Sequence, residues 1–158
     1  MTDWTDENVL DDVTLRLVAS ETGIREILLR WSQPHEGLRN PDNPLLREAS
    51  RQLRAYFVGD LRQFNLPLDM RGTDFQLRCW NQLLKIPYGE TRSYSEIAHA
   101  IRSPKAVRAV GAANGANPIA IVVPCHRVIG SNGKLVGFGG GLPLKKRLLE
   151  LERGSLFA

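Results

Sequence analysis

The first third of the chain alternates apolar and polar residues in a way that is typical of a half-buried sheet. Alternation over residues 13–17 predicts one strand. Residues 21–23 (Glu-Thr-Gly) form a predicted turn, and the apolar run over 24–29 predicts a second strand, paired with the first as a hairpin. The same alternation over 64–68 predicts one more strand.

Helical spacing replaces this alternation after a loop at residues 33–44, which is rich in proline and glycine. From Pro44 onward, apolar residues recur every three or four positions, and Gly59 ends the run, which predicts a helix between these two residues. Residues 1–68 are therefore predicted to form a small α+β unit, and no catalytic motif is visible in it.

Two capping boxes mark helix starts in the second half of the chain. Thr73 and Ser93 are each followed three positions later by a partner, Gln76 and Glu96, that can satisfy the free backbone donors at a helix N-terminus. The first predicted helix places Phe75, Cys79 and Leu83 on one face. The second is short.

A third helix is predicted from Ser103 and Pro104, a cap followed by a proline at the first helical position, to about Gly115, with Val107 and Val110 inward. Because this helix follows the second helix after a short turn, the two together are expected to form a helix-turn-helix. Most of its residues are alanine or glycine, and Arg108 projects among them. Small residues allow either a close approach to a partner, with Arg108 probing a groove, or tight packing on the core, and both can hold on opposite faces.

An apolar run at residues 119–123 predicts a buried strand that delivers Cys125 at its end. A cysteine in such a place is more often a small buried hydrophobe than a nucleophile. His126 and Arg127, however, offer a base and a positive charge beside the sulfur, and both favour a thiolate. Glycine-rich loops follow, which can approach a ligand closely.

The last predicted helix begins near Pro143, with Leu144, Leu148 and Leu151 inward. It also carries Glu150 and Glu152. A carboxylate from this helix can orient the imidazole of His126, as the third member of a triad does. The alternative is that both glutamates are solvated.

Charge is distributed unevenly along the chain. Residues 1–68 hold 8 basic and 11 acidic residues, whereas residues 69–158 hold 13 basic and 6 acidic residues. A half that is so basic attracts polyanions, of which nucleic acid is the commonest, although a solvated basic surface would have the same composition. Two cysteines, no long apolar run and no signal-peptide pattern predict a cytoplasmic protein with no membrane span.

The segment Pro124–Gly130 (Pro-Cys-His-Arg-Val-Ile-Gly) resembles the active-site signature of the O6-alkylguanine-DNA alkyltransferases, also called methylated-DNA–protein-cysteine methyltransferases. The similarity is collinear from about Gly72 to Glu152 and includes the segments 72–76, 88–90, 93–94, 104–111 and 117–118. The fold that this resemblance implies is α/β (α+β). A small ribonuclease-H-like domain over residues 1–68 would precede a mostly helical DNA-binding and alkyl-acceptor domain over 69–158, with a winged-helix-like helix-turn-helix.

The resemblance implies four catalytic residues. Cys125 would take the alkyl group from guanine O6 in an in-line displacement and keep it, as a single-turnover reagent. His126 would accept the thiol proton through a water molecule, and Glu152 would hold His126. Tyr94 would crowd the phosphate of the target nucleotide, which favours its rotation out of the helix, and its hydroxyl would assist the departing guanine.

The resemblance also implies the DNA contacts. Arg108 would enter from the minor groove and fill the gap left by the flipped base, and Asn117 would brace the turn before the active site. Further DNA-backbone contacts would come from Gln76, Ser95, Ser103 and Ser131, and the substrate pocket from Val128, Phe138 and Gly139. Phe138 and Gly139 depart from common family residues, tyrosine and serine, so a side-chain contact is lost.

The implied partner is double-stranded DNA that contains O6-alkylguanine, bound by a monomer, with cooperative binding along DNA left open. No cofactor is implied, and no metal, since residues before 69 contain one histidine, His35, and no cysteine. Two alternatives stay in view. One is a module that recognises alkylated DNA without alkyl transfer, and the other is a cysteine hydrolase that uses Cys125, His126 and Glu152.

Overall fold

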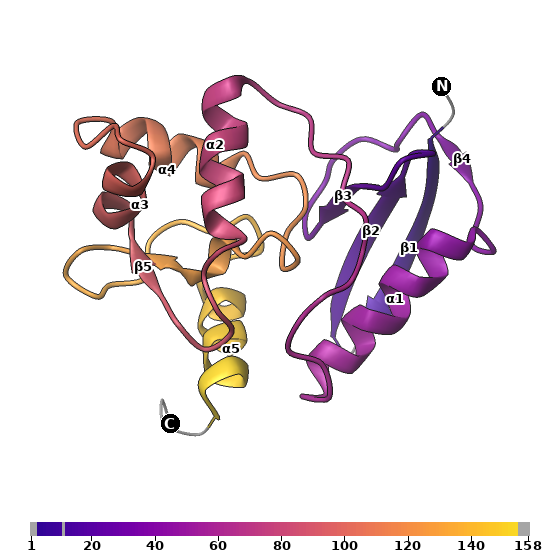
Figure 1. Ribbon diagram of the computed structural model, residues 1–158. Coiled ribbons are helices and arrows are strands. Elements are labelled where there is room, and N and C mark those ends of the chain that lie inside the picture. Colours follow the sequence, from indigo (N-terminus) through magenta and orange to yellow (C-terminus); the bar gives the residue numbers. More distant parts are fainter. Residues whose placement is uncertain (1–2, 11, 155–158) are drawn as a thin grey trace. The chain divides into compact units, whose positions relative to one another are not determined.

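The computed structural model describes residues 3–10 and 12–154, and the chain divides into two compact units, Met1–Arg71 and Gly72–Ala158 (Figure 1). The first contains a sheet and one long helix, and the second contains most of the helices. This mixed α+β architecture confirms the predicted fold class. Among the helices of the described residues, none has the length and hydrophobicity needed to cross a membrane.

The sheet of the first unit has the strand order β3-β2-β1-β4. Its strands are β1 (Trp4–Leu10), β2 (Val13–Ala19), β3 (Ile24–Leu28) and β4 (Leu38–Arg39). The predicted hairpin of β2 and β3 is confirmed, and β1 pairs antiparallel with β2 on its other side. Sequence patterns missed β1 because its central residues are polar and only its last residue is buried.

Helix α1 (Pro44–Phe57) confirms the prediction from helical spacing and packs on the sheet, as Figure 1 shows. The Asn43 side chain caps it by accepting hydrogen bonds from the amides of Leu45 and Leu46, at 3.0 and 3.1 Å. The cap and the apolar face together explain where the helix begins and which side it buries.

The predicted strand at residues 64–68 is wrong, since this segment forms only one isolated bridge, between Leu68 and Ile24. Both backbone hydrogen-bonding groups of Asn65 bind the side chain of Gln52 on α1 instead. Gln52 accepts from the Asn65 amide at 2.9 Å and donates to the Asn65 carbonyl at 3.0 Å. Pro67 has no amide proton to donate to a neighbouring strand. Alternating hydrophobicity therefore reports burial here and not strand pairing.

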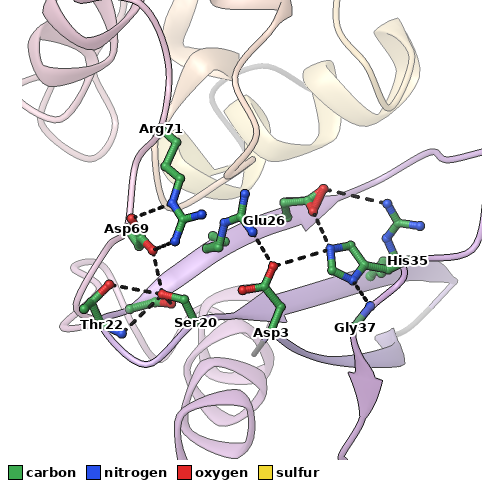
Figure 2. Close-up of polar contacts among 11 residues, drawn as sticks. Asp3, Ser20, Thr22, Glu26, His35, Gly37, Asp69 and Arg71 are labelled. Carbon is green, nitrogen blue, oxygen red and sulfur yellow. Dashed lines mark hydrogen bonds and ion pairs between the residues drawn. The ribbon is translucent and has the colours of Figure 1, made fainter. Parts of the chain in front are cut away.

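Polar side chains hold the loop before β4 and the end of this unit against the sheet (Figure 2). His35 accepts from the Gly37 amide at 2.8 Å through Nδ1, and its Nε2 lies 3.4 Å from Glu26. Asp69 accepts from Ser20 at 2.6 Å and pairs with Arg71 at 2.8 Å. The hydrogen bonds to Asp69, from Arg71 foremost, lower the pKa of that carboxyl to about 2.

The second unit contains α2 (Asp74–Leu83), α3 (Tyr94–Ala100), α4 (Val107–Gly115) and α5 (Leu142–Arg153). A short parallel pair, β5 (Arg92–Ser93) and β6 (Val128–Ile129), joins distant parts of this unit. Both capping boxes predicted from the sequence are formed, at the starts of α2 and α3. Trp80 on α2 is buried and donates to the carbonyl of Ala113 on α4 at 2.8 Å, which fixes these two helices together.

Helix α4 begins three residues later than predicted, at Val107. Ser103 and Pro104 lie in the turn before it, and Ala106 is the N-cap with no side-chain hydrogen bond. Val110 is buried as predicted, but Val107 is 37% exposed. The prediction that Val107 faces inward was therefore wrong, since this first residue of α4 is exposed together with the two residues that follow it.

The predicted strand at residues 119–123 is also wrong, although all five residues are buried. The segment turns sharply, and Ile121 has a left-handed backbone with φ of 72°. The Asn117 side chain holds the turn by accepting from the Ile119 amide at 3.0 Å and donating to the Val123 carbonyl at 2.8 Å. An apolar run cannot by itself distinguish a buried strand from a buried turn.

Candidate active site

Cys125 begins a single 3₁₀ turn, η1 (Cys125–Arg127), between the buried turn and β6. Its side chain is buried. The Cys125 carbonyl accepts from the Asn114 side chain on α4 at 3.3 Å. Burial raises the pKa of the Cys125 thiol, while a hydrogen bond from Asn117 and the charge of Lys145 oppose this rise. The thiol is thus protected and protonated at rest, and needs a base to react.

His126 follows Cys125 in this turn and is fully buried. Its Nε2 lies 2.6 Å from Oε2 of Glu152 on α5, and because an ionised carboxylate only accepts, Nε2 donates. Nδ1 is buried and forms no hydrogen bond with any of the described residues. Burial lowers the pKa of His126 despite the raising effect of Glu152, so the ring is predominantly neutral and Nδ1 carries a lone pair.

Glu152 also accepts two hydrogen bonds from Arg127. The Arg127 Nε and Nη2 atoms donate to its two carboxylate oxygens at 2.7 and 3.1 Å. The Gly89 amide adds a hydrogen bond at 3.2 Å. Burial alone would raise the pKa of Glu152, but the hydrogen bonds from His126 and Arg127 outweigh it and lower the pKa to about 2. Glu152 is therefore anionic at neutral pH.

The sequence suggested that Arg127 supplies the positive charge beside the sulfur, but the structure shows that it does not. The third donor of Arg127, Nη1, binds the Ile86 carbonyl at 2.7 Å, so its guanidinium faces Glu152 and Ile86. Sequence reasoning missed the cation that does act on the thiol, which is Lys145.

Lys145 lies on α5 with no exposed surface. Its Nζ donates to the carbonyls of Val128 and Val136 at 2.6 and 2.7 Å. Burial lowers the pKa of Lys145 to about 8, with the nearby Cys125 opposing this shift. Predicting Leu144 and Leu151 as inward hid this residue, because the buried face of α5 is instead Lys145, Leu148, Leu149 and Glu152.

A pocket of about 620 Å³ opens beside the turn that contains Cys125, with Asn114 as a shared residue. It is lined by Tyr94, Val107, Gly111, Asn114, Gly115, Gly130, Ser131, Val136, Gly137, Phe138 and Gly139. The Tyr94 hydroxyl donates to the Val136 carbonyl at 3.2 Å, and Lys145 donates to the same carbonyl. Both therefore hold the loop between β6 and α5, which forms one wall of the pocket.

Asn114 is the second residue that sequence patterns missed. It is buried, it lines the pocket, and its Oδ1 accepts no hydrogen bond within the described part of the chain. Its position in the small-residue helix was visible, but nothing in the local pattern indicated that it would reach the Cys125 carbonyl.

The residues predicted from the sequence separate into two groups. Tyr94, Ser131, Phe138 and Gly139 meet around the pocket. Val128 does not line the pocket, because it is buried on β6, where its carbonyl accepts a hydrogen bond from Lys145.

The predicted DNA contacts lie on several elements. Arg108 is exposed in the first turn of α4, and Ser95 is half-buried in the first turn of α3. Gln76 is occupied in the capping box of α2, where its side chain accepts from the Thr73 amide at 3.0 Å. Ser103 lies in the turn before α4, 3.4 Å from Arg78. In residues 3–10 and 12–154, histidine, cysteine and carboxylate side chains form no group of three that would hold a metal ion.

Comparison with known proteins gives two matching family models. The model described as 6-O-methylguanine DNA methyltransferase, DNA binding domain, matches residues 74–154, and that described as 6-O-methylguanine DNA methyltransferase, ribonuclease-like domain, matches residues 14–70. The chain belongs to the 6-O-methylguanine DNA methyltransferase family.

Individual members of the 6-O-methylguanine DNA methyltransferase family are also highly similar. The methylated-DNA–protein-cysteine methyltransferase of Mycobacterium tuberculosis is 63% identical over 113 residues, 72% of this chain and 68% of that protein. The protein of that name from Methanosarcina mazei is 48% identical over 145 residues, 89% of this chain and 90% of that protein. The crystal structure of Mycobacterium tuberculosis OGT in complex with DNA covers 97% of this chain and 93% of its own, with a TM-score of 0.86 and 48% identity. The predicted family is therefore confirmed.

Proposed function

We propose that this protein repairs DNA by direct reversal, moving the alkyl group of O6-alkylguanine to Cys125. The observation that carries this proposal is the buried arrangement around His126. One ring nitrogen binds anionic Glu152 at 2.6 Å, and the other accepts no hydrogen bond from the described residues, so it can act as a base in the turn that Cys125 begins. Family membership and the DNA complex of a close relative supply the substrate class.

The reaction transfers one alkyl group and one proton. His126 takes the thiol proton through a water molecule at Nδ1, while Glu152 stabilises the resulting imidazolium. The thiolate then attacks the alkyl carbon, forming the S–C bond as the C–O6 bond breaks. The electron pair of that bond passes to the guanine, which is protonated with help from the Tyr94 hydroxyl. The products are S-alkylcysteine and guanine, so each chain reacts once.

A base inside a duplex hides its O6 from a buried thiol, so the nucleotide must be extruded. Extrusion costs a few kcal/mol, which Arg108 offsets by filling the gap, together with backbone contacts. We assign those contacts to Tyr94, Gln76, Ser95, Ser103 and Ser131, and Asn117 supports the DNA-binding surface by bracing the turn before Cys125. The small residues of α4 suit a close approach to the minor groove. The substrate pocket is assigned to Val128, Phe138 and Gly139.

The two halves of the chain have different proposed tasks. Residues 69–158 bind DNA and accept the alkyl group, and residues 1–68 form the ribonuclease-H-like domain. The protein acts as a monomer in the cytoplasm. Sedimentation of the free protein and of its DNA complexes tests the monomer and measures any cooperativity along the duplex.

The decisive experiment is mass spectrometry of the Cys125 peptide after incubation with a duplex that contains O6-methylguanine. We expect one added methyl per chain in the wild type, none in Cys125→Ala, and full transfer in the matched control Cys79→Ala, which removes the other buried cysteine. Tight binding with an unmodified Cys125 would identify a recognition module instead. Repeated turnover of an ester substrate would identify a hydrolase.

Arg108→Ala tests the extrusion step separately. Transfer from duplex DNA should slow much more than transfer from the free base O6-methylguanine, because only the duplex must release its nucleotide. Equal slowing on both substrates would contradict the role assigned to Arg108.

A further inference from the structure

A second groove lies on the DNA-binding unit, and none of the residues that line it lines the pocket beside Cys125. It measures about 380 Å³ and is lined by Arg78, Asn81 and Gln82 of α2, by Lys85 in the turn after α2, and by Ala100, Ile101 and Arg102 at the end of α3. Three of these seven described lining residues are cationic and none is acidic. We call this feature the basic groove.

Arg78 shapes the basic groove from one side. It donates to the Ile101 carbonyl and lies 3.4 Å from the Ser103 hydroxyl, both in the turn that leads into α4. Its guanidinium therefore fixes the groove to the helix-turn-helix. Lys85 and Arg102 are both exposed, and neither forms an ion pair with any described residue. Their charges remain available to an anion.

Arg102 occupies a position that ordinarily belongs to glycine. Its backbone is left-handed, with φ of 60°, and α3 ends there in a Schellman motif. In this motif the Arg102 amide donates to His99 at 2.9 Å and the Ser103 amide donates to Ala98 at 2.9 Å. A side chain in this conformation is strained, whereas glycine is not. A strained backbone that places a cation at the edge of a basic groove indicates a role for that cation.

We infer that the basic groove binds backbone phosphates of the DNA duplex, outside the lesion-binding pocket, and so lengthens the contact along one strand. The chemistry is that of guanidinium and ammonium groups with phosphodiester oxygens. The turn that Arg78 braces is continuous with α4, which carries Arg108, so both features belong to one DNA-binding element. This inference rests on the proposed function only in taking DNA as the partner.

The test compares the salt dependence of binding to an unmodified duplex in the wild type, Arg102→Gly, Lys85→Gln and the double variant. Each lost phosphate contact should reduce the slope of log affinity against log salt by about 1. Equivalently, the ratio of affinities at 50 and 200 mM salt should fall about threefold per single variant and about tenfold in the double variant. Arg102→Gly should also raise Tm, since it removes the backbone strain.

Lys146→Gln is the matched control, since it removes one charge from the same unit on the exposed side of α5, at 65% side-chain exposure. It should leave the slope unchanged. An equal change in slope in the control, or an unchanged slope in the double variant, would overturn the inference. Transfer from the free base should be normal in every variant, so absence of transfer in the wild type would count against the proposed function alone.

Inorganic phosphate alone separates the two sources of the anion. The amide resonances of Ile101 and Arg102 should not shift in a saturable way with phosphate, because a single phosphate engages too few of the groove's donors. Saturable shifts in the wild type that disappear in the double variant would instead identify a site for free phosphate and overturn the assignment to DNA.

Discussion

Replacement of Glu152 by glutamine should weaken folding in a pH-dependent way. Glu152 has a pKa of about 2 in the folded unit, against an ordinary value of 4.5, because His126 and Arg127 hold its charged form against the cost of burial. That depression corresponds to about 3 kcal/mol of stability at neutral pH. Glu152→Gln should lose about this amount at pH 7, because it keeps the shape of the side chain but cannot pair with Arg127.

The sign of the pH dependence follows from the lowered pKa. The stabilisation is fully present above pH 4.5 and is lost as pH falls toward 2, where the wild-type carboxyl is itself half protonated and neutral. At pH 2 only about half a kcal/mol should remain. The stability difference between wild type and variant should therefore shrink from about 3 kcal/mol to well under 1 kcal/mol across this range.

Urea unfolding measured at a series of pH values provides the assay. The chain has three tryptophans, and of these only Trp80 lies in the second unit, so a Trp4→Phe, Trp31→Phe background makes fluorescence report that unit alone. Glu150→Gln is the matched control on the same helix. Its carboxylate is 37% exposed and 3.7 Å from Lys146, so it should change stability by less than about 0.5 kcal/mol. A gap between wild type and Glu152→Gln that is the same at pH 7 and at pH 2.5 would refute the reasoning.

Two further predictions concern residues in each unit. Lys145→Met should slow transfer about tenfold or more at pH 7 and shift the pH–rate profile to higher pH. The substitution removes the charge that opposes the raised pKa of Cys125, and it leaves the Val128 and Val136 carbonyls without their donor. An unchanged pH–rate profile, measured with the free base, would be evidence against this role of Lys145. Gly23→Ala should destabilise the first unit by more than about 1 kcal/mol, because its Cβ would lie 2.8 Å from the Pro67 carbonyl oxygen, which cannot move aside. A normal urea midpoint for Gly23→Ala, with Trp31 as the probe, would contradict that steric account.

Local signals predicted many of the elements correctly. The caps of α2 and α3 depend on residues three positions apart, and both are formed as the sequence indicates. The hairpin of β2 and β3 and the helix α1 follow from hydrophobic period and turn residues. These signals succeed because donor and acceptor, or successive apolar contacts, lie within one turn of the chain.

Elsewhere the same signals failed where a distant partner decided the outcome. Residues 119–123 and 64–68 have the apolar pattern of strands, but side chains of Asn117 and Gln52 take the backbone groups that a neighbouring strand would need. The start of α4 moved for a related reason, since its N-cap uses no side chain that a motif could reveal.

The sequence by itself determined the reactive segment and the family resemblance, because both depend on one dense motif. From the residues alone Glu152 could equally be solvated, and only the resemblance implied its pairing with His126, which the structure forms at 2.6 Å. Only the tertiary structure decided which cation acts on the thiol. Arg127 is close to Cys125 in sequence, yet its guanidinium pairs with Glu152, whereas Lys145 on α5 acts on the thiol. The physical reason is that a charged side chain is stable in the interior only where carbonyls or carboxylates from other segments pair with it. The spacing of apolar residues along the chain carries no information about those partners.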